Sequence, residues 1–350
     1  MRLILSGEWF KKKGFYEAHI ESVSFYNSLL DIGEIPALSF VVFSFDLSGE
    51  TLNLNLKETE FPKIIVIKIK KIKKLFEVNK TPIFLKLKSQ TLKNSDFKLG
   101  VLKIKNLIKE GTVYQINLTN RFDFYLSGDP LALFLNFYTN QPVPYGFYLD
   151  LDQFYIISGS MELFLEKKGF ILKSKPIKGT SKNLNFLKLS EKDRAENLMI
   201  TDMMRNDIGK IAQIGSVKVT ELFKIKKYRT LYQMYSTVEG FSEKSIIDII
   251  KATFPPASVT GAPKRKAVEM IDNLEPHARG YYCGCAGIVE NETDFTLSVL
   301  IRTAVGKENH LSYYAGCGIV WDSNPEQELS ELYLKVKAFY SPCHSQVKNK

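Results

Sequence analysis

The chain has 350 residues, of which 45 % are hydrophobic, and a formal net charge of +10, so it can bury a large core and, at ~150 residues per domain, form about two domains. It has no run of 18 apolar residues, and its first apolar stretch is too short for a signal peptide, which argues against a membrane partner and predicts a cytoplasmic protein. The lysines are spread along the chain without an arginine and aromatic recognition motif, which argues against nucleic acid and suits a small dianionic substrate.

The first 100 residues contain one clear element, over residues 63–76, where isoleucine and valine are interleaved with lysine. This pattern predicts a strand with one solvated face that ends near Lys73 and Lys74. A basic amphipathic surface that meets a membrane or a partner is the alternative interpretation. Neither interpretation assigns catalytic chemistry to this part of the chain.

Residues 97–110 predict a helix that Gly111 ends. Its apolar positions are spaced as on one helix face: Leu99, Leu102, Leu107 and Ile108. The alternating, β-branched stretch over residues 113–119 predicts a strand that carries Gln115. A short helix is predicted further on, over residues 131–138.

Residues 154–172 predict two antiparallel strands joined by a turn at Lys168 and Gly169. Proline and glycine flank Lys178, so this lysine is expected in a shaped loop and not on a strand ladder. An amine that is partly desolvated in such a loop is a candidate nucleophile. An ordinary solvated lysine is the alternative, because burying an uncompensated amine is costly.

Residues 190–212 predict the strongest helix of the chain, since Ser190 begins a capping box. One face of this helix is apolar: Ala195, Leu198, Met199, Met203 and Ile211. Asp193 and Glu196 lie three residues apart and therefore on one side of the helix. A capping role is the alternative for Asp193.

A further helix is predicted over residues 263–274, directly after Thr260 and Gly261. The start of a helix leaves amides unpaired and carries partial positive charge, so it can bind a carboxylate, although an ordinary capped helix explains the same pattern. Residues 297–305 predict one buried strand. Arg302 in that strand needs an anionic partner, which is either a substrate carboxylate or a structural salt bridge.

The last predicted helix begins after Asn324, a plausible N-cap. Glu328, Glu331 and Lys335 lie on one of its faces, where pairing within the helix is one explanation. With Glu196 opposite, the same side chains would form an oxygen-rich site that suits Mg²⁺. The cysteines fit neither a zinc spacing nor a disulfide framework and are expected to stay reduced: Cys283, Cys285, Cys317 and Cys343.

Several motifs within residues 100–340 together resemble the chorismate-utilising enzymes: YQINL at 114–118, SGSMELF at 158–164, PIKGT at 176–180, ENLMITDMMRND at 196–207 and FPPASVTGAPKRKAVEMIDNLEPHARG at 254–280. The resemblance implies an α+β fold of two packed antiparallel sheets with outer helices and a site in the cleft between the halves. It also implies a single domain over residues 1–350, in which residues 1–100 match only weakly.

The same resemblance implies roles for individual residues. Lys178 would attack C2 of chorismate while Glu162 protonates the departing C4 hydroxyl, and ammonia would then add at C4 and expel the lysine. The implied Mg²⁺ ligands are Glu196, Glu331, Glu328 and, through water, Asp193. The implied substrate contacts are Thr260, Gly261, Tyr282, Arg302, Gly316, Gly318, Lys335 and Gln115. The D-x-x-R-N-D pattern at 202–207 is interpreted as a buried polar network that orients its helix.

Lys178 favours the aminodeoxychorismate synthases within this group, because the similar anthranilate synthases usually carry alanine there. Such enzymes make 4-amino-4-deoxychorismate for folate and para-aminobenzoate synthesis. No cysteine lies in a G-x-C-x-G elbow, so ammonia is expected from a separate glutamine amidotransferase partner. Isochorismate and salicylate synthases carry a water-activating lysine at the place of Gln115, and an amide cannot act as that base.

Two alternatives stay open. The chain is an anthranilate synthase component if it releases anthranilate from chorismate. It is a catalytically silent chorismate-binding subunit if the departures at Met161 and Gln233 remove activity. Many relatives carry a histidine at the position of Gln233, and a glutamine can donate a hydrogen bond but cannot give up a proton.

Overall fold

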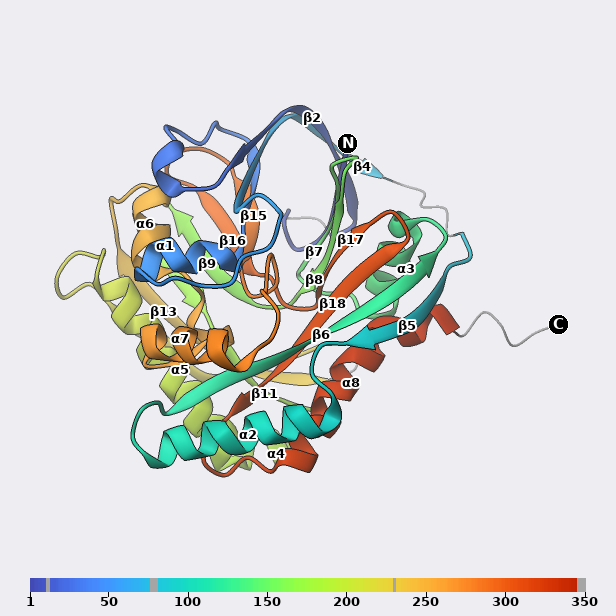
Figure 1. Cartoon of the computed structure of the whole chain (residues 1–350). Coiled ribbons are helices and arrows are strands. Elements are labelled where there is room, and N and C mark those ends of the chain that lie inside the picture. The colour runs from blue at the N-terminus through green and yellow to red at the C-terminus, as the bar shows by residue number, and fades with distance from the viewer. Residues whose placement is uncertain (11–12, 76–80, 229–230, 345–350) are drawn as a thin grey trace.

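The computed structural model describes residues 1–10, 13–75, 81–228 and 231–344, with side chains as far as Tyr340 (Figure 1). The strands are β1 (Arg2–Gly7), β2 (Phe15–Tyr26), β3 (Ser39–Phe43), β4 (Ile64–Leu75), β5 (Phe84–Gln90), β6 (Gln115–Ser127), β7 (Tyr145–Asp150), β8 (Tyr155–Ser160), β9 (Leu163–Lys168), β10 (Ile171–Lys175), β11 (Ile177–Ser181), β12 (Lys218–Lys227), β13 (Tyr232–Phe241), β14 (Gly261–Ala262), β15 (Cys285–Val289), β16 (Phe295–Val299), β17 (Thr303–Lys307) and β18 (His310–Ile319). The helices are α1 (Ser48–Leu52), α2 (Asn94–Lys109), α3 (Pro130–Asn140), α4 (Leu184–Leu189), α5 (Glu191–Gly209), α6 (Ile246–Thr253), α7 (Lys264–Leu274) and α8 (Pro325–His344), with 3-10 turns η1 (Leu29–Asp31), η2 (Phe45–Leu47) and η3 (Ala257–Val259).

The strands form two antiparallel sheets that are joined through β2. Sheet I has the order β5, β6, β18, β17, β8, β7, β1, and the short β14 also pairs with β6. The long β2 pairs with both β1 and β4. Sheet II continues as β4, β3, β15, β16, β9, β10, β13, with β11 and β12 also on β13. Because β2 pairs with a strand of each sheet, the two sheets are continuous in hydrogen bonding although they pack face to face.

Three apolar clusters hold these layers together. One lies between the two sheets and includes Leu5 of β1, Phe147 of β7 and Phe40 of β3. A second packs α2, α3 and α8 on the outer face of sheet I, and a third packs α5 and α6 on the outer face of sheet II. In Figure 1, α2 and α8 lie along β6 and β5, whereas α5, α6 and α7 gather at the left. The predicted fold of two packed antiparallel sheets with outer helices is confirmed.

Several predicted elements are present with small differences at their ends. The predicted strand over residues 63–76 is β4, which runs past Lys73 and Lys74 to Leu75, while Phe76 lies outside the described residues. Only its second half has a solvated face, because the first half lies between two clusters, with Ile64 facing one and Ile65 the other. The turn predicted at Lys168 and Gly169 joins β9 and β10, but residues 154–172 contain three strands and not two, because β8 belongs to sheet I. The strongest predicted helix is α5, and its Ser190 side chain accepts a hydrogen bond from Asp193 N at 3.2 Å. Its predicted apolar face is wrong at Ala195 and Leu198, which are exposed, while the buried apolar residues are Ile200, Met204 and Ile208.

The apolar face predicted for the first helix is correct at Leu107 and Ile108, which pack against the core, and wrong at Leu99 and Leu102. In α2 the buried residues are Phe97, Val101 and Ile104, whereas Leu99 and Leu102 are about half exposed. The helix packs on the stripe that contains Gly100, because a Cβ at Gly100 would lie 3.0 Å from the Leu118 side chain of β6. Close approach of helix and strand therefore selects the buried face. The end of the helix is as predicted, with Gly111 at φ +73°.

The buried polar network predicted for residues 202–207 is also mostly wrong. Asp207 is buried and pairs with Lys264 and Lys210, but Asp202 and Arg205 are exposed and pair with each other at 3.0 Å. The periodicity of α5 explains the difference, since residues at i and i+5 cannot share one narrow face.

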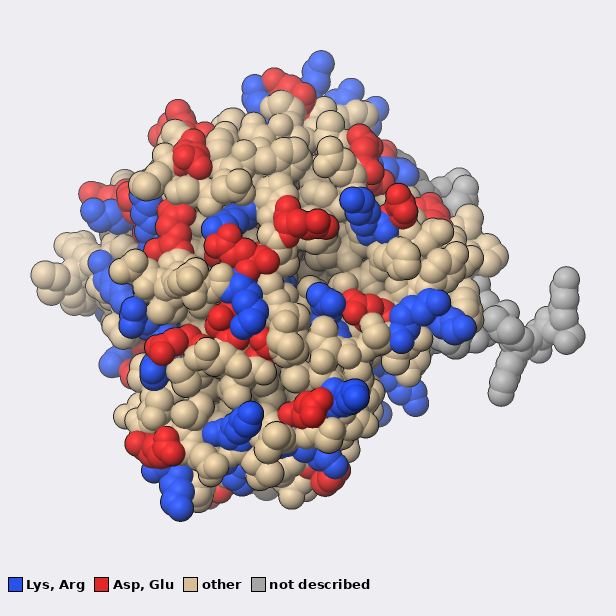
Figure 2. All heavy atoms as spheres, viewed as in Figure 1, with Lys and Arg blue, Asp and Glu red and all other residues tan. Residues whose placement is uncertain are grey.

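Three surface and chemical features complete the description. No helix in the described ranges is both long and apolar enough to cross a membrane. Figure 2 shows basic and acidic side chains interspersed over one face of the molecule, with a hollow near its centre. The thiols of Cys283, Cys285 and Cys317 are free and buried, and the side chain of Cys343 lies outside the described part.

Candidate active site

The chain passes from one sheet to the other at two places that lie side by side. Between β8 and β9 the crossing contains Glu162, and between β16 and β17 it contains Arg302. Val299 N donates to Glu162 O at 3.1 Å, and Gly159 N donates to Arg302 O at 3.2 Å. The single strand predicted over residues 297–305 is therefore wrong, because the chain leaves the ladder of sheet II and Arg302 adopts φ +51°. These two crossings form one wall of the candidate site.

Glu162 is buried in this wall, with 5 % of its surface exposed. Burial raises the pKa of Glu162 to about 7, although a hydrogen bond from the Ser258 side chain, the charge of Lys178 and the Ile177 amide all favour the carboxylate. Ile177 N lies 3.4 Å from Glu162 Oε1. A carboxyl group with a pKa near neutrality can give and take a proton at physiological pH.

Lys178 lies on a strand and not in the predicted loop. β11 pairs with β13 at Ile177 opposite Tyr235 and at Thr180 opposite Gln233, with an irregularity between the two pairs. Three residue steps on β11 therefore face two on β13, which is the geometry of a bulge. The bulge lies at Lys178 and the following glycine, which adopts φ +86°, and it explains the glycine after this lysine.

The Lys178 amine and the Gln115 side chain both lie close to Gly318. A Cβ at Gly318 would lie 3.3 Å from Lys178 Nζ and 2.5 Å from Gln115 Nε2. Gln115 is 1 % exposed, and its Oε1 has no hydrogen-bond partner among the described residues. Since buried polar groups are normally paired, this oxygen is available to a ligand. A Cβ at Gly316 would likewise lie 2.8 Å from Leu118 O.

Acidic side chains from α5 and α8 converge beside this amine. Atoms of Cys317, Glu328 and Glu331 that can bind a metal lie within 4.8 Å of one another. Lys192 Nζ lies 4.0 Å from oxygens of both Glu196 and Glu328, which brings the two helices together. Burial raises the pKa of Glu196, and the charges of Lys178 and Lys192 oppose this shift.

Glu331 is held by a neighbouring lysine. Lys335 Nζ lies 2.7 Å from Glu331 Oε1 and donates to Gly316 O at 2.7 Å, and its charge lowers the pKa of Glu331. Glu328 and Glu331 of α8 therefore lie together with Cys317, and Glu196 of α5 lies near Glu328 across the shared Lys192 amine. Three of them are oxygen donors of the kind that Mg²⁺ prefers.

Arg302 has no anionic partner in the described part of the chain. Burial lowers the pKa of its guanidinium, which donates only to the side-chain amide of Gln141. The salt bridge that was the alternative for Arg302 is thus not formed here. A half-buried, always charged side chain without a counter-ion suits an anionic ligand.

Four predicted residues are placed less directly. Thr260 uses its amide and hydroxyl within its own turn, on Ala257 and Pro256, so its donors are already engaged. Gly261 pairs with Ile116 of β6, where a Cβ would lie 2.1 Å from Gln115 O. Tyr282 is buried and stacks on Tyr314 with ring centroids 5.4 Å apart. Asp193 borders the bulge, since a Cβ at Gly179 would lie 3.1 Å from its Cγ.

Three neighbours of the site were missed by sequence reasoning. Ser258 lies inside a quoted motif but carried no separate signal. Lys192 precedes Glu196 by one helical turn, so the i, i+4 spacing was a usable signal for their pairing. Ser323 donates to Glu328 Oε1 at 2.7 Å, and no local pattern marks this bond. Gln233, singled out in the sequence, is buried and contacts the sulfur of Met161.

Comparisons with solved structures define the class of fold. Anthranilate synthase component I from Streptococcus pneumoniae TIGR4 superposes with a TM-score of 0.76 at 24 % identity, covering 97 % of this chain and 90 % of that one. The menaquinone-specific isochorismate synthase of Escherichia coli gives a TM-score of 0.78 at 16 % identity, covering 98 % and 88 %. At these identities the likeness concerns the fold, which is that of the chorismate-utilising enzymes.

The chain belongs to the chorismate binding enzyme family, whose profile matches residues 32–341. Anthranilate synthase component 1 of Saccharolobus solfataricus is 37 % identical over 71 % of this chain and 62 % of its own length. Aminodeoxychorismate synthase component 1 of Bacillus subtilis is 37 % identical over 69 % and 54 %, and that of Escherichia coli is 38 % identical over 67 % and 54 %. The matched regions therefore span little more than half of these relatives, and both kinds of enzyme occur at the same identity.

Proposed function

We propose that this chain is the chorismate-converting component of an aminodeoxychorismate synthase, which turns chorismate and ammonia into 4-amino-4-deoxychorismate. The position of Lys178 supports this proposal more than any other observation. Its amine lies close to Gly318 and interacts with three surrounding carboxylates: Glu162, Glu196 and Glu331. Such an amine can act as a nucleophile beside an acid, whereas Gln115 cannot activate water.

The proposed reaction consists of two displacements. Lys178, as the free amine, forms a bond from Nζ to C2 of chorismate, the two ring double bonds shift, and the C4–O bond breaks. Glu162 gives its proton to the departing oxygen, which leaves as water. Ammonia then bonds to C4, the double bonds shift back, and the C2–N bond breaks with its electron pair returning to Lys178. The Glu162 carboxylate takes one proton from the new ammonium group, which restores both residues.

The acidic cluster fits a divalent cation. Glu196, Glu328 and Glu331 would hold Mg²⁺ together with the ring carboxylate of the substrate, and Asp193 would reach it through water. When bound, Mg²⁺ neutralises that carboxylate and withdraws electron density from the ring. Arg302, which has no anionic partner in the described ranges, would bind the second carboxylate of the substrate.

Product analysis tests the proposal. Wild-type protein, Lys178→Ala and the control Lys182→Ala, which changes an exposed lysine on the same segment, are incubated with chorismate, Mg²⁺ and an ammonium salt. We expect 4-amino-4-deoxychorismate from wild type and the control, and none from Lys178→Ala. Release of anthranilate by the wild type, together with full activity of Lys178→Ala, would refute the assignment.

Anthranilate synthase is the second candidate, because a curated relative of that name matches at the same 37 % identity. The same assay decides between the two, since anthranilate is fluorescent and is separable from the amino-deoxy product. A wild type that consumes no chorismate would instead indicate a silent binding subunit.

We further propose that ammonia comes from a separate glutamine amidotransferase, as the name "component 1" of the relatives indicates for those proteins. Glutamine should replace the ammonium salt only when such a partner is added. Activity with glutamine in the absence of any partner would contradict this part of the proposal.

A further inference from the structure

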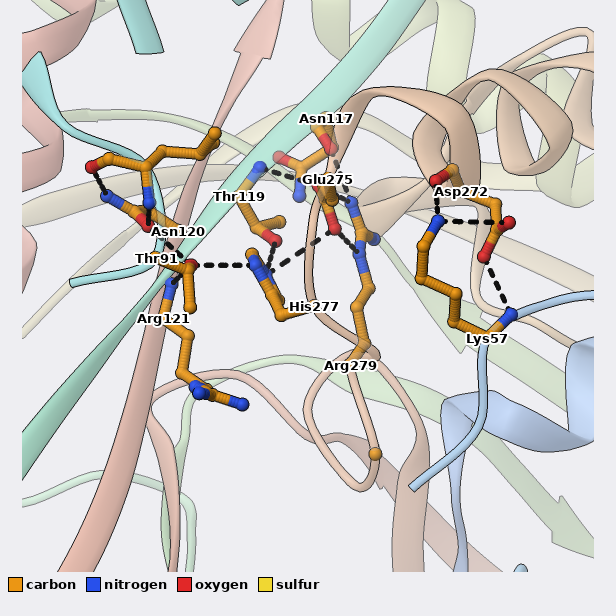
Figure 3. A network of polar contacts seen from close by, with 12 residues as sticks. Lys57, Thr91, Asn117, Thr119, Asn120, Arg121, Asp272, Glu275, His277 and Arg279 are labelled. Carbon is orange, nitrogen blue, oxygen red and sulfur yellow. Dashed lines mark hydrogen bonds and ion pairs between the residues drawn. The ribbon is translucent and has the colours of Figure 1, made fainter. Parts of the chain in front are cut away.

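A buried ion pair lies where the end of α7 meets β6 (Figure 3). Glu275 and Arg279 are each 2 % exposed, and Arg279 Nε and Nη2 donate to the two Glu275 oxygens at 2.9 and 2.7 Å. Three further bonds leave the pair. Arg279 Nη1 donates to Val259 O at 2.8 Å, Arg279 Nη2 to Asn117 O at 2.6 Å, and Thr119 N donates to Glu275 Oε1 at 2.8 Å. One ion pair thus ties together segments that are far apart in the sequence.

Two of the tied segments carry residues of the candidate site. Asn117 follows Gln115 by two residues on β6, so both side chains lie on the same face of the sheet. Val259 belongs to η3 and directly follows Ser258, whose side chain hydrogen-bonds Glu162. The bond from Arg279 to Val259 O therefore holds the backbone directly next to Ser258.

The neighbouring His277 does not disturb this pair near neutral pH. Burial lowers the pKa of His277 to about 4, and its ring nitrogens contact the hydroxyls of Thr91 and Thr119 at 2.8 and 3.2 Å. His277 also lines a separate cavity of about 830 Å³, whose lining contains none of the candidate catalytic or metal-binding residues. Glu275 and Arg279 do not line that cavity.

Stability alone is a weak reason for such a pair. Desolvation of two charges offsets most of their attraction, and apolar side chains of similar volume often stabilise a protein as well. What apolar residues cannot do is bind two backbone carbonyls and an amide in fixed directions. The planar, bidentate guanidinium does this with several donors at once.

We propose that Glu275 and Arg279 are positioning residues for the chorismate site. Through Val259 they keep Ser258 in hydrogen-bond contact with Glu162, and through Asn117 they keep β6 in register beside Gly318. The proposal deepens the proposed function and rests on it for the catalytic meaning of Glu162, but its first test does not require turnover.

The test follows the ionisation of Glu162 directly. The protein is labelled with ¹³C at the glutamate carboxyl groups, the Glu162 signal is assigned with Glu162→Gln, and its titration is recorded by NMR. The variants are Ser258→Ala, Arg279→Lys and the double variant, with Asp272→Asn as control. Arg279→Lys keeps the charge beside Glu275 but has no fork to reach both carbonyls. Asp272 lies on the same helix and bonds only to Lys57 in the described chain.

We expect Ser258→Ala to move the Glu162 titration upward by about one pH unit, the effect of losing one hydrogen bond to a carboxylate. Arg279→Lys should move it in the same direction, and the double variant should titrate like Ser258→Ala, because both changes remove one interaction. Lys178, the only charged group acting on Glu162 in the described residues, is unchanged in every variant. Asp272→Asn should titrate like wild type.

A wild-type titration in Arg279→Lys, or shifts that add in the double variant, would overturn the positioning role. If Arg279→Lys shows no folded spectrum, Glu275→Asp makes the same comparison, because it keeps the charge pair but shortens the carboxylate arm. Chorismate consumption is measured on the same samples. A wild type that titrates as expected but consumes no chorismate refutes the proposed function and leaves the positioning role intact.

Discussion

Replacing Glu162 by glutamine should change the pH dependence of folding stability. The pKa of this carboxyl group is raised from 4.5 to about 7 by burial. Below pH 4.5 the group is protonated in both the folded and the unfolded chain, so its ionisation does not affect stability. As the pH rises from 4.5 to 7 only the unfolded chain ionises, and the folded state loses stability. Above pH 7 both states are ionised and the loss is constant.

The size of the loss follows from the two pKa values. The difference between 4.5 and about 7 corresponds to about 3 kcal/mol of unfolding free energy. Because the Glu162 carboxyl group is buried, solvent screening does not reduce this figure much. Between pH 5 and pH 8 wild type should lose about 2.5 kcal/mol through this group. Glutamine has a similar shape but does not ionise, so Glu162→Gln should not show this loss.

Urea unfolding of wild type and Glu162→Gln at pH 5 and pH 8 measures the effect. Other carboxyl groups contribute equally to both proteins and cancel in the comparison. The advantage of Glu162→Gln should therefore be about 2.5 kcal/mol larger at pH 8 than at pH 5. Glu292→Gln, at an exposed turn, serves as control and should show no such difference. An equal advantage of Glu162→Gln at both pH values would refute the burial argument.

Three further changes probe the rest of the site. Lys192→Gln removes an ammonium group that lies 4.0 Å from oxygens of Glu196 and Glu328. Calorimetry should then show Mg²⁺ binding about threefold to fivefold tighter, the scale of one screened ion pair. An unchanged affinity would contradict the idea that Lys192 competes with Mg²⁺ for these carboxylates. Arg302→Gln should raise the KM for chorismate at least about tenfold, as expected for losing a charge-assisted bond, and an unchanged KM would exclude Arg302 from substrate binding. Gly318→Ala should lower turnover, because the added Cβ would lie 2.5 Å from Gln115 Nε2 and 3.3 Å from Lys178 Nζ, so both side chains must move. Gly33→Ala, with open space around it, should keep wild-type activity, and an equally active Gly318→Ala would contradict the site geometry.

The elements that sequence reasoning predicted well are those with a strong local signal. The cap at Ser190 and the N-cap at Asn324, whose side chain accepts from two amides of α8, are encoded within a few residues. The buried face of α2 is not encoded locally in this way. Whether Leu99 or Val101 is buried depends on the contact between Gly100 and Leu118 of β6, a strand that follows the helix in the sequence. Packing between elements decided that choice, and no pattern inside α2 contains it.

The placement of Lys178 shows a different limit. The proline and glycine around it were interpreted as a loop, but Gly179 lies in a bulge of β11 and Pro176 directly precedes that strand. A bulge and a loop both need an irregular backbone, so the same residues serve either. Only the partner strand, β13, separates the two cases, and its register cannot be derived from the residues near Lys178.

The two crossings between the sheets explain why the wall of the candidate site could be predicted from its charged residues but not from its secondary structure. Met161 and Leu163 flank Glu162, and apolar residues stand on both sides of Arg302, so no turn residue at either position marks the crossing. At a crossing, however, the backbone leaves one ladder before it joins the next, and a side chain there is buried without a cross-strand neighbour. A charged residue at such a place has no local partner to pair with. At Glu162 and Arg302, therefore, a single charged residue among apolar ones marks a place where the chain changes sheet and where we expect a charged ligand to bind.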